Sequence, residues 1–411
     1  MQTKIPAEKL ASEAGREADR ILRSCVHCGF CTATCPTYQL LGDELDGPRG
    51  RIYLIKEMLE SGSVTDKTRD HLDRCLTCRS CESTCPSGVE YAHLLDIGRE
   101  LCEAGTERPM GERLHRKAMV ALLPNRARFS LLLKGASLIK PLLPKRLKAS
   151  LPSVSQTPLN WPQLRHERKV LLIEGCVQPV LDAGIDRAAA IVLDRAGISV
   201  QRTGMAQCCG ALEHHLNATD AAHKRMRKNI DHWWPYLEAG VEAIISTASA
   251  CALQLKEYGY LLRNDPAYAE KAKQISALTA DISELIARQE LPATNGDGEK
   301  IAFHASCTLQ HGQKLSGVVE AILSKAGYEL VAVNNSHLCC GAAGTYTLLQ
   351  PEIGEALSMN KIESLEAGQP ARIATANIGC MKQIEAGSEI PVVHWIELLA
   401  ELYEKPQTDR G

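Results

Sequence analysis

The feature that most constrains this chain is a run of four closely spaced cysteines that occurs twice near the N-terminus. Residues 25–36 read CVHCGFCTATCP and residues 75–86 read CLTCRSCESTCP. Both fit the spacing C-x2-C-x2-C-x3-C-P, in which three thiolates lie in one tight loop and the fourth points away. Four thiolates can ligate the four irons of a cube of iron and sulfide. The two runs therefore predict two [4Fe–4S] clusters.

The fourth cysteine of each run is expected to bind the other cluster. This crossing over ties the two motifs together and keeps the clusters close enough for electrons to hop between them. The predicted ligand sets are Cys25, Cys28, Cys31 and Cys85 for the first cluster, and Cys75, Cys78, Cys81 and Cys35 for the second. Forty residues separate Cys35 from Cys75, more than a compact ferredoxin uses, and residues 51–62 have helical periodicity. We therefore expect a helical ferredoxin-type domain.

Disulfide bonds and zinc are the competing explanations for so many cysteines. The chain has 17 cysteines in 411 residues, whereas disulfide-rich proteins are usually small and secreted. Residues 1–25 are polar, without the apolar stretch of a secretion signal, and no segment is apolar enough to span a bilayer. Structural zinc favours two cysteine pairs separated by a longer loop. We therefore expect iron–sulfur clusters in a cytoplasmic protein whose thiols stay reduced.

Other polar residues near the runs have less specific roles. His27, His71 and His93 are expected to be structural, because eight cysteines already complete two ligand sets. Cys102 is expected to be a buried thiol. Three arginines flank the runs and either offset cluster charge or are ordinary surface residues: Arg23, Arg74 and Arg79.

Residues 111–168 differ from the rest of the chain in charge and proline content. From Arg113 to His166 there are eleven Lys or Arg residues, no Asp or Glu, and six prolines. The segment is either a linker wrapped over the domains or a basic amphipathic surface that rests on anionic lipid or an acidic partner. The net charge of the whole chain is −2, which argues against a generally basic nucleic-acid binder.

The C-terminal half contains an internal repeat. Residues 169–174 (KVLLIE) and 300–304 (KIAFH) read as buried strands that each end just before a cysteine, and each copy then reaches a Cys-Cys-Gly sequence. The distance from the first cysteine to the pair is 32 residues in both copies. Further strand-like runs alternate with helical stretches, which predicts α/β units with parallel sheets. Cysteines at the ends of the strands would then meet at one edge of each sheet.

Each repeat supplies four thiols for a further site. The candidate sets are Cys176, Cys208, Cys209 and Cys251 in the first copy, and Cys307, Cys339, Cys340 and Cys380 in the second. The glycine after each pair lets the backbone approach a bulky group closely. These sets either hold one or two further iron–sulfur clusters or are buried thiols retained from a duplication.

The sequence as a whole predicts an α+β multidomain protein. We expect an N-terminal all-α helical ferredoxin-type domain with two [4Fe–4S] clusters at residues 1–110 and a basic Pro/Leu-rich linker at 111–168. Two duplicated α/β Cys-Cys-Gly units are expected at 169–290 and 300–405. No Gly-rich dinucleotide fingerprint follows a strand, so the chain is not expected to take a hydride from a substrate unaided.

Nearly the whole chain resembles the iron–sulfur subunits of flavin-linked 2-hydroxy-acid dehydrogenases, and most of all those of glycolate oxidase, also called glycolate dehydrogenase. Residues 47–62 (GPRGRIYLIKEMLESG) and 339–346 (CCGAAGTY) carry this resemblance with particular strength. It is shared, less closely, with the small subunit of anaerobic glycerol-3-phosphate dehydrogenase, lactate-utilisation proteins and heterodisulfide reductase. In the last of these, each unit ends in C-x-x-C, whereas here Ala248 and Asn377 replace the first cysteine of that pair.

The resemblance implies an electron-transfer subunit without a catalytic residue of its own. FAD would be held only on partner subunits, which would oxidise glycolate to glyoxylate, and the electrons would pass toward a membrane quinone. The protein would then lie in the cytoplasm, peripheral to the inner face of the cell membrane. Three alternatives stay open: the same subunit of a lactate or glycerol-3-phosphate dehydrogenase, a thiol–disulfide reductase subunit, and a module that uses clusters only for assembly or redox sensing.

Overall fold

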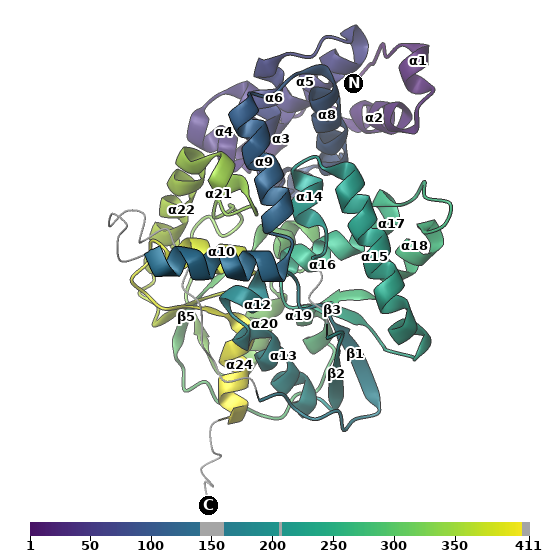
Figure 1. Cartoon of the computed structure of the whole chain (residues 1–411). Coiled ribbons are helices and arrows are strands. Elements are labelled where there is room, and N and C mark those ends of the chain that lie inside the picture. The colour runs from purple at the N-terminus through teal and green to yellow at the C-terminus, as the bar shows by residue number, and fades with distance from the viewer. Residues whose placement is uncertain (140–159, 205–207, 405–411) are drawn as a thin grey trace, which may run out of the picture.

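The computed structural model describes residues 1–139, 160–204 and 208–404. The chain forms an N-terminal cap of helices above two α/β units, each with a four-stranded sheet (Figure 1). The expected combination of a helical domain and parallel sheets is confirmed.

The regular elements of residues 1–105 are all helices joined by loops, with no strand in that range. Its elements are α1 (Ala7–Leu10), α2 (Glu13–Ser24), α3 (Phe30–Ala33), α4 (Pro36–Leu41), the 3-10 turn η1 (Glu44–Asp46), α5 (Pro48–Ser61), α6 (Asp66–Asp73), α7 (Ser80–Thr84) and α8 (Tyr91–Gly105). Helix α5 begins with a proline, which needs no backbone donor there, and ends before Gly62 with φ of 76°. Ile21, Ile55 and Leu94 form the buried contact between α2, α5 and α8.

The first half of the segment interpreted as a linker is helical. Helices α9 (Met110–Leu122) and α10 (Arg126–Ile139) meet near Pro124, so one proline separates two long helices rather than many short pieces. Arg116 of α9 binds Asp73 of α6 at 3.1 Å, and Phe129 of α10 packs into the core of the first α/β unit. Residues 140–159, including Lys145 and Arg146, lie outside the described residues.

The first α/β unit has a parallel sheet in the order β2-β1-β3-β4. Its strands are β1 (Arg168–Leu172), β2 (Ile198–Arg202), β3 (Ile244–Ser246) and β4 (Thr279–Asp281). Its helices are α12 (Gln178–Leu181), α13 (Gly184–Arg195), α14 (Ala211–His215), α15 (Thr219–Glu238), α16 (Ser249–Lys256), α17 (Tyr258–Leu261), α18 (Ala269–Leu278) and α19 (Ile282–Ile286).

The second unit repeats this topology in the order β6-β5-β7-β8. Its strands are β5 (Lys300–His304), β6 (Glu329–Leu330), β7 (Arg372–Thr375) and β8 (Val392–His394). Its helical elements are η3 (Thr308–Gly312), α20 (Val318–Lys325), α21 (Tyr346–Leu349), α22 (Pro351–Glu366), α23 (Ile378–Glu385) and α24 (Trp395–Glu404). Strand β6 is only two residues long, because the ladder to β5 ends at Leu330.

The two α/β units share one hydrophobic core. Residues of the first sheet, such as Val170 and Ile245, belong to the same buried cluster as Phe303 and Trp395 of the second. Polar contacts add to this joint: His394 bonds the carbonyl oxygen of Thr247 at 3.0 Å. The duplicated units therefore pack as one body, on which the helical cap rests.

Candidate iron–sulfur centres

The first hollow in the helical cap is lined by thiols from both cysteine runs. Cys25 follows α2, Cys28 lies in the loop, Cys31 lies in α3, and Cys85 follows α7; all four line one hollow. Cys28 is exposed, whereas Cys25 is buried. One side of this hollow therefore reaches the protein surface.

The second hollow contains the other four thiols. We call it the deeper hollow, because three of these thiols are buried and none is exposed. Cys35, Cys75, Cys78 and Cys81 line it together. The structure thus brings together the same two groups of four that the sequence suggested, each with three thiols from one run and one from the other. Their role as cluster ligands stays a prediction. Pro48, Cys81 and Tyr91 line both hollows, so the two share a wall.

The two cysteine loops have the same unusual backbone. His27 and Gly29 have φ of 56° and 82°, and the matching Thr77 and Arg79 have φ of 53° and 59°. Left-handed backbone at residues other than glycine is strained and gathers at functional sites. It also turns successive amides toward one centre, where they can donate to negative sulfur. The Thr77 amide already donates to Cys75 Sγ at 3.4 Å.

Further donors and one cation surround the second hollow. The Tyr91 hydroxyl donates to Cys75 Sγ at 3.8 Å. The Arg51 guanidinium is fully buried and donates to the carbonyl oxygen of His71 at 2.7 Å. Burial alone would lower the pKa of Arg51, but the neighbouring Cys75, Tyr91 and Cys35 hold its pKa above the ordinary value. A buried cation beside four thiols suits a negatively charged cluster.

The flanking arginines of the cysteine runs pair with carboxylates, and Arg51 itself lies 3.6 Å from the buried Asp46. Arg23 binds Asp19, Arg74 binds Asp46, and Arg79 binds Glu257. The sequence interpretation missed Arg51 and Tyr91, which lie far from the runs in sequence. The three histidines also have structural contacts: His27 stacks on Tyr53, His71 bonds Asp46 and His93 bonds Glu257.

The first Cys-Cys-Gly unit brings its four thiols together in a row, in which Cys176, Cys208 and Cys209 are buried and Cys251 is half-buried. Cys208 contacts Cys176 on one side and Cys209 on the other, and Cys209 contacts Cys251. The contact with Cys208, together with burial, raises the pKa of Cys176 well above its ordinary value. The pKa values of Cys208 and Cys209 are also raised well above the ordinary value, so Cys176, Cys208 and Cys209 would be neutral until a cation binds them.

The second unit has the corresponding row beside the deeper hollow. Cys307 Sγ lies 4.0 Å from Cys339 Sγ, and Cys340 contacts both Cys339 and Cys380. Cys78, from the second hollow, packs against the buried cluster that contains Cys307 and Cys339. The second unit therefore adjoins the deeper hollow directly. All four donors are thiols, which can bind a metal ion or a cluster as thiolates. All four are also buried.

These features define the class of the protein as an iron–sulfur electron-transfer protein. Residues 21–89 match the family model of the 4Fe-4S dicluster domain, and residues 170–256 and 301–385 match that of the Cysteine-rich domain. The glycolate oxidase iron-sulfur subunit of Escherichia coli (strain K12) is 52% identical over 98% of this chain and 100% of its own length. The chain therefore belongs to the family of glycolate oxidase iron–sulfur subunits, as its resemblance suggested.

More distant relatives also align with this chain. The probable glycolate oxidase iron-sulfur subunit of Bacillus subtilis (strain 168) is 29% identical, covering 92% of this chain and 94% of that protein. Lactate utilization protein A of Bacillus licheniformis is 27% identical, covering 56% of this chain and 98% of that protein.

One solved structure shares the fold. A hypothetical protein from Helicobacter pylori matches with a TM-score of 0.57 and 10% identity, covering 97% of this chain and 74% of that one. In the described part of the chain, no helix has the length and apolar character needed to cross a membrane.

Proposed function

We propose that this chain is the electron-transfer subunit of a flavin-dependent glycolate dehydrogenase complex. It would receive electrons from reduced FAD on partner subunits that oxidise glycolate to glyoxylate, and pass them toward a membrane quinone. The observation that carries the proposal is the pair of thiol-lined hollows, which share a wall that includes Cys81. When bound there, [4Fe–4S] clusters accept and release one electron each, which divides the pair held by a reduced flavin.

The protein residues would hold and insulate these groups. Eight thiolates would bind the irons: Cys25, Cys28, Cys31 and Cys85 in the outer hollow, and Cys75, Cys78, Cys81 and Cys35 in the deeper one. Arg51 would offset the charge of the deeper group. The buried surroundings would keep out water and limit stray reaction with oxygen.

The outer hollow is the suitable place for a redox partner to approach. Cys28 is exposed there, and the neighbouring Val26 and Phe30 are 66% and 59% exposed. Exposed large apolar side chains around a functional centre favour protein contact. Electrons could then pass inward to the deeper hollow, whose Cys78 adjoins the second Cys-Cys-Gly unit.

Glycolate is favoured over the alternatives by the extent of the family match. The alignment with the glycolate oxidase relative from Escherichia coli covers 98% of this chain, whereas that with the lactate utilization protein covers 56%. Substrate choice itself would lie on the flavin subunit. A thiol–disulfide reductase role is disfavoured because Ala248 and Asn377 stand where heterodisulfide reductase has cysteines.

The test is anaerobic co-purification with the flavin subunits, iron and sulfide analysis, and reduction by glycolate followed by electron paramagnetic resonance. We expect about four irons in each hollow, and cluster signals that grow when glycolate is added. Cys78→Ser should remove the signal of the deeper cluster, whereas Cys102→Ala, a buried thiol against Met58, should leave both clusters. Protein without inorganic sulfide, or clusters that glycolate does not reduce, would contradict the proposal.

Contact with the membrane surface is a separate part of the proposal, and it rests on α10. Phe129 faces the protein core, while Leu131 and Leu132 are exposed beside the exposed Arg126 and Arg128. Basic residues next to exposed leucines suit an anionic lipid surface. Arg126→Glu with Arg128→Glu should reduce sedimentation with anionic vesicles, and Lys224→Glu with Lys228→Glu on α15 should not. Equal sedimentation of both variants would exclude α10 as the contact.

A further inference from the structure

A buried histidine in the second Cys-Cys-Gly unit has no hydrogen-bond partner in the described structure. His304 ends strand β5 and is 2% exposed, and neither Nδ1 nor Nε2 finds a donor or acceptor. Leaving a buried polar group unpaired destabilises the folded state. An unpaired polar side chain in an ordered core suggests that a bound ligand would pair with it.

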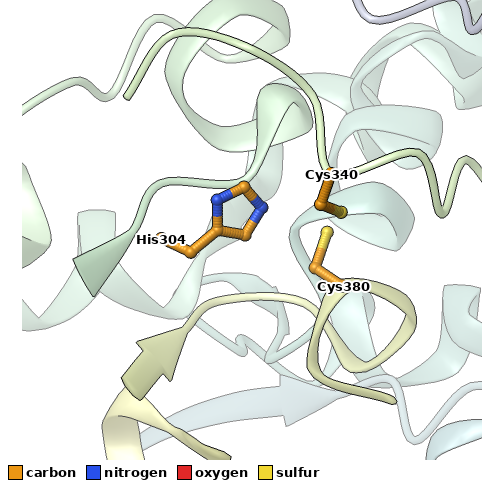
Figure 2. Close-up of side chains that lie close together, drawn as sticks. All are labelled: His304, Cys340 and Cys380. Atoms are coloured by element: carbon orange, nitrogen blue, oxygen red, sulfur yellow. The ribbon is translucent and has the colours of Figure 1, made fainter. Parts of the chain in front are cut away.

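The imidazole faces two thiols from other elements. One ligand atom each of His304, Cys340 and Cys380 lies within 4.8 Å of the other two (Figure 2). Cys340 lies in the Cys-Cys-Gly loop and Cys380 in α23. Three segments far apart in the sequence therefore present three metal-binding atoms to one point.

We propose that His304, Cys340 and Cys380 bind a single zinc-class metal ion. Zinc takes thiolate at about 2.3 Å and imidazole at about 2.0–2.1 Å in a tetrahedron, which sets neighbouring donors roughly 3.5–4 Å apart. The observed triangle is close to that size. In an iron–sulfur cube each thiolate binds a different iron, so the donors would be spread more widely. Cys339, in contact with Cys340, is the nearest thiol for the fourth position.

The charge of the surroundings also fits this ion. Three thiolates, one neutral imidazole and a divalent ion carry one net negative charge. The buried Lys361 would offset it: its ammonium donates to the carbonyl oxygen of Asn335 at 2.8 Å, and although burial lowers its pKa below the ordinary value, the nearby Cys340 and Cys339 act in the opposite direction. The ion would join β5, the Cys-Cys-Gly loop and α23, and so act as a structural centre of the second unit.

The first unit lacks this arrangement. Because both copies have the same spacing from first cysteine to pair, the residue three positions before Cys307 corresponds to the residue three positions before Cys176, which is Ile173. Ile173 is buried in the apolar cluster of the first sheet. The proposal therefore distinguishes the two units: the nitrogen ligand belongs to the second alone. It goes beyond electron transfer and does not depend on the identity of the substrate.

The test is metal analysis of the full-length, iron-loaded chain purified anaerobically with zinc present. We expect about one zinc per chain, with a zinc X-ray absorption spectrum that requires one nitrogen among sulfur ligands. His304→Ala should lower zinc content about tenfold or more at unchanged iron, and His304→Cys should restore it, because thiolate also binds zinc. His394→Ala, which removes another buried histidine at a strand end, should keep the zinc.

Three results would overturn the proposal. They are wild-type protein essentially free of zinc, zinc retained in His304→Ala, and a zinc spectrum with sulfur ligands alone. Iron lost from His304→Ala in place of zinc would instead assign the histidine to an iron–sulfur cluster and would also refute a single-ion site. The absorption spectrum of the wild-type chain keeps the test decisive even where His304→Ala does not fold.

Discussion

At the scale of single residues, the second hollow is shaped by side chains that the cysteine runs do not contain. Arg51 comes from α5 and Tyr91 from α8, and both lie beside Cys75. Donors and cations near a cluster stabilise its more negative, reduced state. Their distance in sequence from the runs means that only packing of α5 and α8 brings them to the thiols.

Tyr91→Phe should make the deeper cluster harder to reduce. The change removes the hydroxyl that donates to Cys75 Sγ and leaves the ring in place. A hydrogen bond of about 0.5–1.5 kcal/mol corresponds to a fall in midpoint potential of roughly 20–60 mV for one electron. Redox titration followed by electron paramagnetic resonance measures it. Tyr328→Phe, whose hydroxyl donates to the distant Leu398 carbonyl, is the control and should leave the potential unchanged.

Asp186→Asn should weaken the pH dependence of stability. Burial raises the pKa of Asp186 to about 7, although Thr247 and Gln178 donate hydrogen bonds to it. Between its ordinary pKa and 7 the unfolded chain has lost this proton while the folded chain keeps it, so stability falls as pH rises. From about pH 5.5 to pH 7 this carboxyl costs about 2 kcal/mol.

The asparagine oxygen can still accept both hydrogen bonds of the carboxyl group, so the variant should lose that part of the slope. Urea midpoints of both proteins, followed by tryptophan fluorescence from about pH 5.5 to about pH 8, test this prediction. Parallel curves for the two proteins would show that the carboxyl does not titrate in this range.

At the scale of elements, the two Cys-Cys-Gly loops are alike in backbone and differ in packing. Gly210 and Gly341 have φ of 89° and 81°, in the left-handed region that glycine adopts readily. A Cβ at position 210 would have its nearest neighbour at 3.6 Å, whereas one at position 341 would lie 2.5 Å from the backbone oxygen of Gly354. The second loop is therefore pressed against α22.

Gly341→Ala should destabilise the protein more than Gly210→Ala. Left-handed backbone alone costs about 1–2 kcal/mol for alanine, which is the expected effect at position 210. At position 341 the clash adds about 1–3 kcal/mol, because a backbone atom must move. Thermal unfolding of the two variants under anaerobic conditions gives the comparison. Equal losses in Tm would mean that α22 can move away from the added methyl group without a loss of stability.

At the scale of the whole molecule, the interface between the two α/β units differs from the interface between the helical cap and the α/β body. The two α/β units share a large continuous apolar core, whereas the cap contacts them through a smaller apolar cluster around Leu76 and Tyr346 and through polar pairs such as Arg79 with Glu257. Within the cap, eight thiols surround two hollows beside the small apolar core of α2, α5 and α8. The short helices that carry the cysteine loops therefore depend on what fills those hollows.

Removal of the clusters should unfold the cap before the sheets. Metal centres contribute folding free energy where the residues around them cannot form a core alone. After oxidation and chelation under argon, amides of α3, α4 and α7 should lose hydrogen-exchange protection, while those of β1 and β5 keep it. Mass spectrometry of peptides reports both regions in one sample. Uniform loss of protection across the chain would show that the cap and body unfold together.

Local spacing in the sequence was enough to predict several features. The two four-cysteine runs indicated iron–sulfur chemistry, and the 32-residue interval with its strand-like flanks predicted two parallel α/β units. Those patterns are readable because cluster-binding loops and strands depend on residues close together in the chain. The family resemblance added the electron-transfer role.

Tertiary packing decided the rest. Three side chains lie beside thiols of other segments, and their proposed roles depend on those contacts: Arg51, Tyr91 and His304. The prolines and the basic charge pattern suggested a linker, so the sequence did not predict helices α9 and α10. In the structure, Arg116 binds Asp73 and Phe129 packs into the core, and these contacts hold the two helices in place. A sequence records which donors exist, whereas only the folded chain determines which donors lie within bonding distance of the same point.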